Sequence, residues 1–546
     1  MEHELSKAAQ LERLLDIGLR LHQQGSLGEA EEVYREILRA DFQHSDAWHL
    51  LGVLALQADF AKVAIELISE AVTLDPEQPI FRNNLGNAYR RLGHLDMALR
   101  CYGTALFLKP DYVEAHYNKA TVLREDGELD AAVEAYRTAL RLKPDDVDSL
   151  NDLGGTLRRQ GEYQGAIDCY RAAIELDANE PGIHVNLGQV LEDRGDQQAA
   201  LGCYQRALEL KPDHATALLC WAELRPFTLD DRAEIERIEA LLSDKTLSHE
   251  QIEHIHRVLG KVHDDCGLFD RAFEHYRLAN TIKRERDGIV FNRQVHADFI
   301  SRVITTFDAR FFAQRNAYGI QSELPVFLIG MPHSGKSELG RVLAAHPRIR
   351  GAGDLSYFED LSKQLPPGLE TTRPYPDCAE LIDAKSAERM AEIYVEQLRK
   401  RGGDAERIFD TAPNYAHVGL IALLFPNARI IHCQRHPLDI SVAIYFKCFA
   451  RGQAYAYDLK DIAACYRAYA RLMGHWQDVL GDRMLTVAYE DLVADEARVR
   501  RELVQFCSLQ WDGADTMPAP VLSDRFVDYW RNFEDYLGEL KSELGY

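Results

Sequence analysis

The sequence lacks the features expected of a membrane or secreted protein. Its longest apolar runs, such as Leu420 to Phe425, fall far short of the roughly 20 residues that span a bilayer. The first residues, Met-Glu-His-Glu-Leu-Ser-Lys, contain no charged start, apolar stretch and cleavage site. The ten cysteines form no C-x-x-C pair and are interpreted as small core residues. The sequence therefore predicts a cytoplasmic protein.

The sequence also lacks an excess of positive charge. Lysine and arginine number 63 against 87 aspartates and glutamates, a net charge of -24. Nucleic acids and anionic membranes bind a dominant basic face, so neither is an expected partner. The 46% hydrophobic and 27% charged composition is typical of folded domains, and 546 residues exceed a single core. We therefore expect two or three folded units.

A repeat of 34 residues runs through the first part of the chain. Leu85-Gly86 recurs as Leu153-Gly154 and Leu187-Gly188, and an alanine is followed four positions later by an aromatic or isoleucine, as in Ala98 and Tyr102. The pattern resembles the tetratricopeptide repeat, in which the small residues let two antiparallel helices approach and the aromatic fills the gap. We predict six repeats over 11–214, then a helical cap or linker over 215–323. That segment holds a seventh, isolated unit marked by Gly260, Ala272, Tyr276 and Ala279.

Stacked repeats form a solenoid with a concave groove lined by the first helix of each unit. One repeat position carries side chains that hydrogen-bond well, namely Asn84, Asn118, Asp152 and Asn186. The arrangement resembles the asparagine ladder of O-linked N-acetylglucosamine transferases, which implies that a peptide or protein binds the groove through its backbone. The alternative is that these residues only cap or solvate their helices.

The repeat pattern gives way near residue 324 to an apolar run, Pro325 to Ile329, that is typical of a buried parallel strand. The loop Gly330-Met-Pro-His-Ser-Gly-Lys-Ser337 and a helical stretch follow. A glycine-rich loop between a strand and a helix start presents backbone N–H groups to a phosphate. The loop also fits G-x-x-x-x-G-K-[ST]. We therefore predict a phosphate-binding α/β domain with a parallel sheet over 324–546, so that the fold class is an all-α solenoid followed by α/β.

Further motifs in this domain resemble sulfotransferases. Phe425 to Asp439 contains an apolar strand that ends at Arg435, Leu343-Ala-Ala-His-Pro347 closes the loop helix, and Gly351-Ala-Gly-Asp-Leu355 and Tyr489-Glu-Asp-Leu492 follow the family's order. With the repeats in front, the whole chain resembles bacterial tetratricopeptide-repeat sulfotransferases, which are related to protein tyrosine sulfotransferases. That resemblance implies transfer of a sulfuryl group from 3'-phosphoadenylyl sulfate, as co-substrate and without a metal, to a hydroxyl of a peptide, protein or polymeric acceptor.

The resemblance also implies roles for individual residues. Ser334, Gly335, Lys336 and Ser337 would surround the 5'-phosphosulfate, and Arg435 would bind the 3'-phosphate. Ser441 would add a ligand contact, since the family's serine two residues later is Ala443 here. Asp354 stands where the family has its general base. The family's loop has a cation at His333 and a threonine at Lys336, so either residue is a candidate for the catalytic cation.

Two other functions remain open from the sequence. In a nucleoside-triphosphate enzyme, Lys336, Ser337 and Asp410 would bind ATP and magnesium. For Asp354, the alternative to a general base is a cap on the helix that starts near Ser356. In a scaffold protein, the repeats would bind partners and the second domain would be inactive.

Overall fold

The structure is a computed structural model, and it describes residues 7–449, 452–510 and 526–546. The chain divides into two compact units, Met1–Arg225 and Pro226–Tyr546. Within the described residues, no helix is long and apolar enough to cross a membrane.

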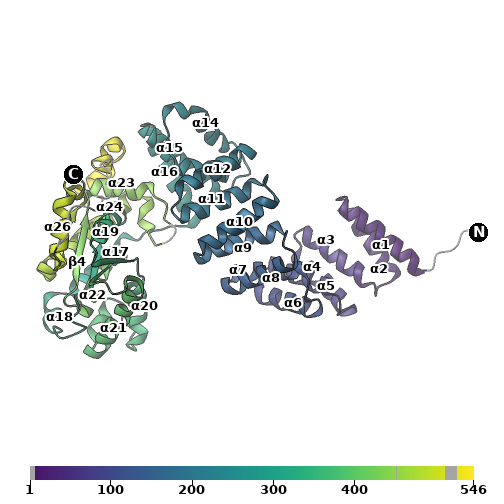
Figure 1. Cartoon of the computed structure of the whole chain (residues 1–546), viewed down its shortest axis with the longest axis horizontal. Coiled ribbons are helices and arrows are strands. Elements are labelled where there is room, and N and C mark those ends of the chain that lie inside the picture. The colour runs from purple at the N-terminus through teal and green to yellow at the C-terminus, as the bar shows by residue number, and fades with distance from the viewer. Residues whose placement is uncertain (1–6, 450–451, 511–525) are drawn as a thin grey trace, which may run out of the picture. The chain divides into compact units, whose positions relative to one another are not determined.

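The first unit consists of helices in antiparallel pairs (Figure 1). A Cβ atom built on Gly86 would lie 2.6 Å from the Tyr102 ring, and one on Gly188 would lie 2.5 Å from Tyr204. At these two positions the helices of a pair approach so closely that only glycine fits opposite the aromatic ring. The helices are α1 (Lys7–Gln23), α2 (Leu27–Ala40), α3 (Ser45–Gln57), α4 (Ala61–Leu74), α5 (Pro79–Arg91), α6 (Leu95–Leu108), α7 (Val113–Asp126), α8 (Leu129–Leu142), α9 (Val147–Gln160), α10 (Tyr163–Leu176), α11 (Pro181–Asp193), α12 (Gln197–Leu210) and α13 (Ala215–Leu224).

The second unit begins with helices and continues as an α/β domain. Among its first helices, α15 and α16 repeat the close contact, since a Cβ atom on Gly260 would lie 2.8 Å from Tyr276. The Tyr276 ring stacks on Phe446 of the α/β domain at 4.0 Å, so this hairpin shares the core of the second unit. The helices that precede the sheet are α14 (Arg232–Leu241), α15 (His249–Asp265), α16 (Phe269–Asp287), α17 (Arg293–Thr306) and α18 (Ala309–Ala313).

The α/β domain is built on a parallel sheet with the strand order β2-β3-β1-β4-β5. Its strands are β1 (Pro325–Ile329), β2 (Ile349–Gly353), β3 (Arg407–Asp410), β4 (Arg429–Gln434) and β5 (Met484–Ala488). All five residues of β1 are buried, as expected for a central strand that is covered on both faces. The predicted fold class, a helical repeat region followed by a parallel α/β domain, is confirmed.

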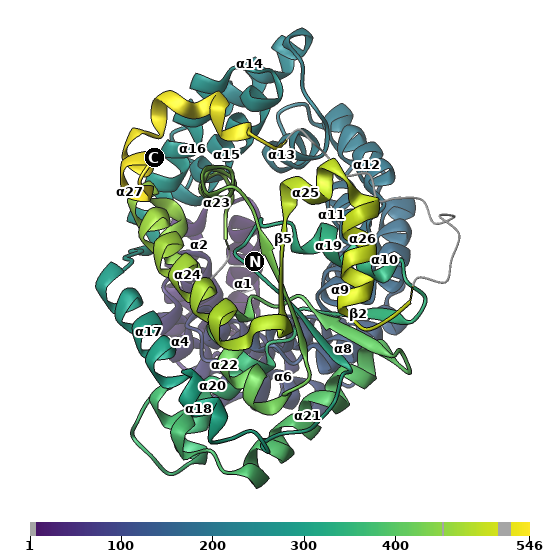
Figure 2. The same cartoon turned by 90° about the vertical axis from the view of Figure 1, so that its left-hand side faces the viewer.

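Helices cover both faces of the sheet. Val326 and Leu328 pack with α19 and α26, whereas Phe327 and Ile329 belong to the larger core on the α24 side. Figure 2 shows α24 on one side of β5 and α19 and α26 on the other. The helices are α19 (Lys336–Ala344), α20 (Tyr357–Gly368), α21 (Ala384–Gly402), α22 (Val418–Leu424), α23 (Pro437–Phe446), α24 (Leu459–Leu480), α25 (Tyr489–Ala494), α26 (Glu496–Phe506) and α27 (Gly538–Leu544), with the 3-10 segment η7 (Tyr529–Tyr536) before the last.

Candidate phosphate site and repeat groove

The loop between β1 and α19 has the backbone of an anion site. His333 and Gly335 both adopt left-handed φ angles, of 62° and 97°. A Cβ atom on Gly335 would also lie 2.5 Å from the Tyr489 ring, so glycine is needed there on two counts. The loop leads directly into Lys336 and Ser337, whose N–H groups lie in the first helical turn and have no partner within a helix. These N–H groups and the helix dipole favour a phosphate or sulfate group.

Two buried polar atoms beside this loop have no hydrogen-bond partner in the described part of the chain. They are Oγ of Ser334, a residue that is 2% exposed, and Nε of Arg435, which is 7% exposed. Burying a polar atom without a partner costs about 1–3 kcal/mol. Such a cost at adjoining residues is expected where a ligand supplies the missing partner.

Arg435 follows β4 and reaches the same loop. Its Nη1 donates to the carbonyl of His333 at 3.0 Å, and its Nη2 donates to that of Phe526 at 2.7 Å. The guanidinium group lies 5.2 Å from the centre of the Tyr489 ring. The structure therefore brings Arg435 against the loop, although the two are about a hundred residues apart in sequence.

Lys336 and Asp354 lie on either side of Thr411, at the carboxyl ends of β1, β2 and β3. Lys336 Nζ donates to the Thr411 carbonyl at 3.0 Å, and the Thr411 hydroxyl donates to the Asp354 carboxylate. Desolvation lowers the pKa of Lys336, while the charges of Asp354 and Asp410 oppose that shift. The arrangement places a cation and an exposed carboxylate next to the loop.

His333 differs from Lys336 in its charge. Its ring lies edge-on to Phe449, with the centroids 6.0 Å apart. Desolvation lowers the pKa of His333 to about 4, and Lys447 and Arg435 push the pKa in the same direction. Both effects favour the neutral imidazole, so Lys336 is the stronger candidate for a cation at the loop.

Ser337 and Ser441 occupy different surroundings. Ser337 is exposed at the start of α19. Ser441 is fully buried in α23, and its hydroxyl donates to the carbonyl of Pro437 at 2.6 Å. The structure groups Ser337 with the loop but turns the Ser441 hydroxyl toward its own helix.

Asp410 ends β3 and is 1% exposed. Its carboxylate accepts hydrogen bonds from the backbone N–H groups of Leu355 and Ala412 and from the side chains of Tyr394 and Asn414. These donors give the carboxylate a structural role, which is to fix the loops after β2 and β3. Within the described residues, no three His, Cys, Asp or Glu side chains are grouped to hold a metal ion.

Several residues near the site escaped the sequence analysis as functional candidates. Thr411 links Lys336 to Asp354, and Tyr489 covers both Gly335 and Arg435. Asp439 accepts from the N–H groups of Asp528 and Trp530 and so fastens the C-terminal segment to α23. Asp439 and Tyr489 lie within the sulfotransferase-like motifs of the sequence, but their contacts depend on segments that are distant along the chain.

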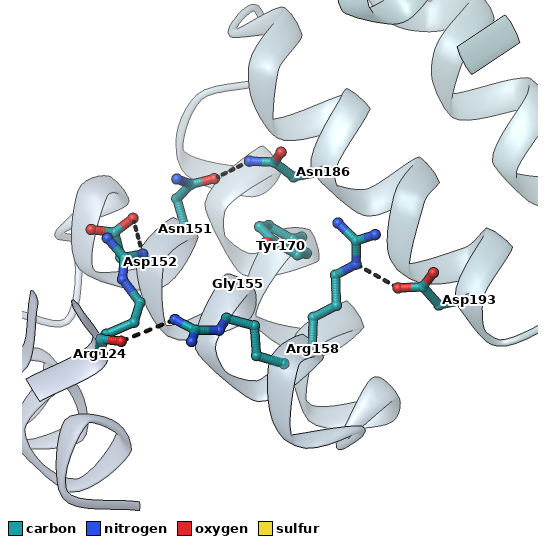
Figure 3. Close-up of a pocket in the computed structure, with 9 residues that line it drawn as sticks. Arg124, Asn151, Asp152, Gly155, Arg158, Tyr170, Asn186 and Asp193 are labelled. Atoms are coloured by element: carbon teal, nitrogen blue, oxygen red, sulfur yellow. Dashed lines mark hydrogen bonds and ion pairs between the residues drawn. The ribbon is translucent and has the colours of Figure 1, made fainter. Parts of the chain in front are cut away.

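The predicted groove residues lie on the first helices of successive repeats. Each bonds to a neighbouring repeat: Asn84 Nδ2 meets His49 Nε2 at 2.8 Å, Asn118 donates to Asn83 at 2.9 Å, and Asn186 donates to Asn151 at 2.8 Å. Asp152 accepts from Tyr117 and pairs with Arg124 at 3.0 Å. The side-chain oxygens of Asn118 and Asn186 have no hydrogen-bond partner among the described residues. Figure 3 shows the hydrogen bond that joins Asn186 of the sixth repeat to Asn151 of the fifth.

Comparisons with known proteins agree with this two-part architecture. Residues 325–513 match the sulfotransferase family. Tetratricopeptide repeat families match 15–79, 83–147, 154–195 and 181–214. The chain therefore combines tetratricopeptide repeats with a sulfotransferase-family domain, as its sequence motifs predict.

Two curated relatives are similar to parts of the chain. An uncharacterized protein of Aquifex aeolicus is 27% identical over 345 residues, which cover 59% of this chain and 45% of the relative. A protein-tyrosine sulfotransferase of Drosophila melanogaster is 23% identical over 208 residues, which cover 37% of this chain and 41% of the relative. Each match thus spans less than half of the relative.

Among solved structures, the chain is similar to YrrB, described as a TPR protein with an unusual peptide-binding site. The identity is 20%, the match covers 34% of this chain and 97% of that one, and the TM-score is 0.31. The MamA structure is 22% identical, and that match covers 30% of this chain and 96% of MamA with a TM-score of 0.29.

Proposed function

We propose that the second unit is a sulfotransferase that uses 3'-phosphoadenylyl sulfate and that the repeats hold its polypeptide or polymeric acceptor. The observation that carries the proposal is the contact of Arg435 with the phosphate loop, together with the unpartnered Arg435 Nε and Ser334 Oγ. A second phosphate on the nucleotide is what such an arginine would bind. The sulfotransferase family model and the likeness to a protein-tyrosine sulfotransferase support the same chemistry.

In this proposal, the acceptor oxygen bonds to the sulfur while the bond from sulfur to the bridging phosphate oxygen breaks. The Asp354 carboxylate takes the proton of the acceptor hydroxyl. Lys336 stabilises the negative charge that develops on the departing oxygen. Ser334, Gly335 and Ser337 line the loop that holds the 5'-phosphosulfate, and Arg435 holds the 3'-phosphate. In this proposal, side chains and backbone N–H groups of the protein supply the base, the cation and the phosphate contacts.

The proposal is tested by thermal unfolding with 3'-phosphoadenosine 5'-phosphate, adenosine 5'-phosphate, or ATP with magnesium. A ligand that binds only the folded state stabilises it by about 2.7 kcal/mol at a concentration of about 100 times Kd. We expect the largest rise in Tm with the 3'-phosphorylated nucleotide. A larger, magnesium-dependent rise with ATP would contradict the proposal and favour a nucleoside-triphosphate enzyme.

Arg435→Ala is expected to weaken binding of 3'-phosphoadenosine 5'-phosphate by about ten- to hundredfold, because a charge-assisted hydrogen bond contributes about 1.5–3 kcal/mol. Binding of adenosine 5'-phosphate should change little. Titration calorimetry with both nucleotides measures the difference. Arg341→Ala, which removes an exposed arginine of α19, is the matched control. Equal losses for the two nucleotides would show that Arg435 is structural.

The groove part of the proposal rests on the unpartnered oxygens of Asn118 and Asn186, which can accept backbone N–H groups of an extended peptide. Each replacement by alanine should weaken binding about fivefold, since one exposed hydrogen bond contributes about 1 kcal/mol. The probe is a pool of capped, randomised peptides of equal length, and fluorescence anisotropy measures their binding to each variant.

Asn83→Ala provides the control for the asparagine replacements. It removes the hydrogen bond that Asn118 makes to the neighbouring repeat but keeps Asn118 itself. Its stability should fall like that of Asn118→Ala, while peptide binding should persist. If the two variants lost binding equally, the ladder would have only a structural role.

A further inference from the structure

The fifth repeat differs from its neighbours at one hydroxyl group. In the third repeat Tyr102 donates to Asn87 at 2.7 Å, and in the fourth Tyr136 and Thr121 are 3.0 Å apart. The fifth repeat has Gly155 at the repeat position that holds Asn87 in the third repeat and Thr121 in the fourth. The hydroxyl of Tyr170 consequently has no hydrogen-bond partner among the described residues.

A pocket lies beside this hydroxyl, and both Gly155 and Tyr170 line it. A Cβ atom built on Gly155 would lie 3.4 Å from the Tyr170 hydroxyl oxygen, so a longer side chain would occupy the space next to the hydroxyl. The pocket has a volume of about 550 Å³. Figure 3 shows Tyr170 lying between Asn186, Gly155 and Arg158, with Arg124 and Asp152 at the other end of the pocket.

The charges around the pocket favour an anion. Arg124 pairs with Asp152 and Arg158 pairs with Asp193. The third arginine of the lining, Arg159, donates to the carbonyl of Arg124 at 3.0 Å, which leaves its charge without a carboxylate in the pocket. The lining thus carries one net positive charge in a chain whose net charge is -24.

The Tyr170 hydroxyl is a hydrogen-bond donor at neutral pH. Desolvation raises the pKa of Tyr170 to about 12, so the group keeps its proton. A neutral donor beside arginines is suited to a carboxylate, which offers oxygen atoms that only accept hydrogen bonds.

We propose that this pocket binds the carboxylate of an aspartate or glutamate side chain of the polypeptide that lies in the groove. Arg158 uses Nε and Nη1 for Asp193 and Gln189, so the carboxylate is held by the Tyr170 hydroxyl and by Nη2 of Arg158. Gly155 leaves room beside the hydroxyl, and Arg159 supplies the uncompensated charge. The proposal rests on the polypeptide capture inferred above and adds a sequence requirement to it. Backbone contacts through the ladder would accept many sequences, whereas this pocket would select those with an acidic residue in register.

The test compares three pools of equally long peptides that are randomised among uncharged residues. The first is capped and carries one glutamate, the second is capped and carries glutamine instead, and the third carries glutamine and a free C-terminal carboxylate. We expect the intact protein to bind the glutamate pool about tenfold more tightly than the glutamine pool, as measured by fluorescence anisotropy.

Gly155→Thr is the sharpest variant, because the chain itself shows at Thr121 that threonine fits this position and reaches the tyrosine hydroxyl. It should abolish the preference for glutamate while raising the Tm slightly, since glycine inside a helix is unfavourable. Tyr170→Phe should reduce the preference severalfold. Arg137→Gln, which removes an exposed arginine of α8 that is paired with Glu134, should leave the preference unchanged.

Each alternative outcome counts against the proposal in a different way. Equal binding of the glutamate and glutamine pools would exclude the subsite but leave polypeptide capture intact. A gain confined to the third pool would show that the pocket binds a chain terminus. If no pool bound, both the subsite and the groove proposal would fail, while nucleotide binding by the second unit would still be judged by its own titration.

Discussion

Lys336→Ala is expected to slow sulfuryl transfer about 10²–10³-fold, the usual effect of removing one preorganised electrostatic partner from a transition state. Lys336 begins α19 and its ammonium group lies 3.0 Å from the Thr411 carbonyl, next to the Asp354 carboxylate that Thr411 also contacts. Its charge and the Asp354 carboxylate are thus both fixed by contacts with Thr411. Nucleotide affinity should fall less than turnover, because the backbone N–H groups of the loop remain.

His333 provides the comparison for Lys336. His333→Asn keeps a residue that tolerates the left-handed backbone at φ 62° but removes the imidazole. Since desolvation lowers the pKa of His333 to about 4, the ring is neutral at pH 7 and its loss should cost less than that of Lys336. After circular dichroism has shown that both variants fold, initial rates with labelled donor show which variant loses more activity. A greater loss in His333→Asn would assign the cation's task to His333.

Asp354→Asn is expected to slow transfer about 10²–10⁴-fold without changing nucleotide affinity, because an amide keeps the shape of the carboxylate but cannot accept the proton. The Asn side-chain oxygen can still accept the hydrogen bond of Thr411, so the loop should stay in place. Helix α20 begins after Ser356, whose hydroxyl donates to Asp360, and Asp354 contacts Thr411 instead. A capping role therefore does not explain Asp354.

Asp360→Asn is the matched control for Asp354→Asn, since it makes the same change on the exposed face of α20. It should leave both turnover and nucleotide binding unchanged. Normal turnover in Asp354→Asn would remove this residue from the proposed chemistry.

The sequence predicts the fold well where the physical constraint is local and repeated. A glycine opposite a tyrosine sixteen residues later, as in Gly86 and Tyr102, reflects a contact too close for any other side chain. The loop from Gly330 to Ser337 is similarly local, since its strand, glycines and helix start are contiguous. Each of these features needs only neighbouring residues to be recognised.

The rest depends on contacts between distant segments. The hydrogen bonds from Asp528 and Trp530 to Asp439 cross about 90 residues, and no local pattern indicates them. The pairing of Asn118 with Asn83 gives the ladder a structural task in addition to the proposed one. Gly155 occupies a repeat position that varies along the chain, with Asn87, Thr121 and Gln189 in other repeats. Its meaning emerges only when the Tyr170 hydroxyl is seen to lack the partner that Tyr102 and Tyr136 have.

The most direct test of the proposed function is transfer of labelled sulfate from 3'-phosphoadenylyl sulfate to peptides that the repeats capture and that contain tyrosine, serine or threonine. We predict that the label becomes attached to a peptide hydroxyl, and that this attachment is greatly reduced in Lys336→Ala but persists in His333→Asn. Binding of the donor without transfer to any captured peptide would contradict this function and indicate a repeat scaffold with an inactive second domain.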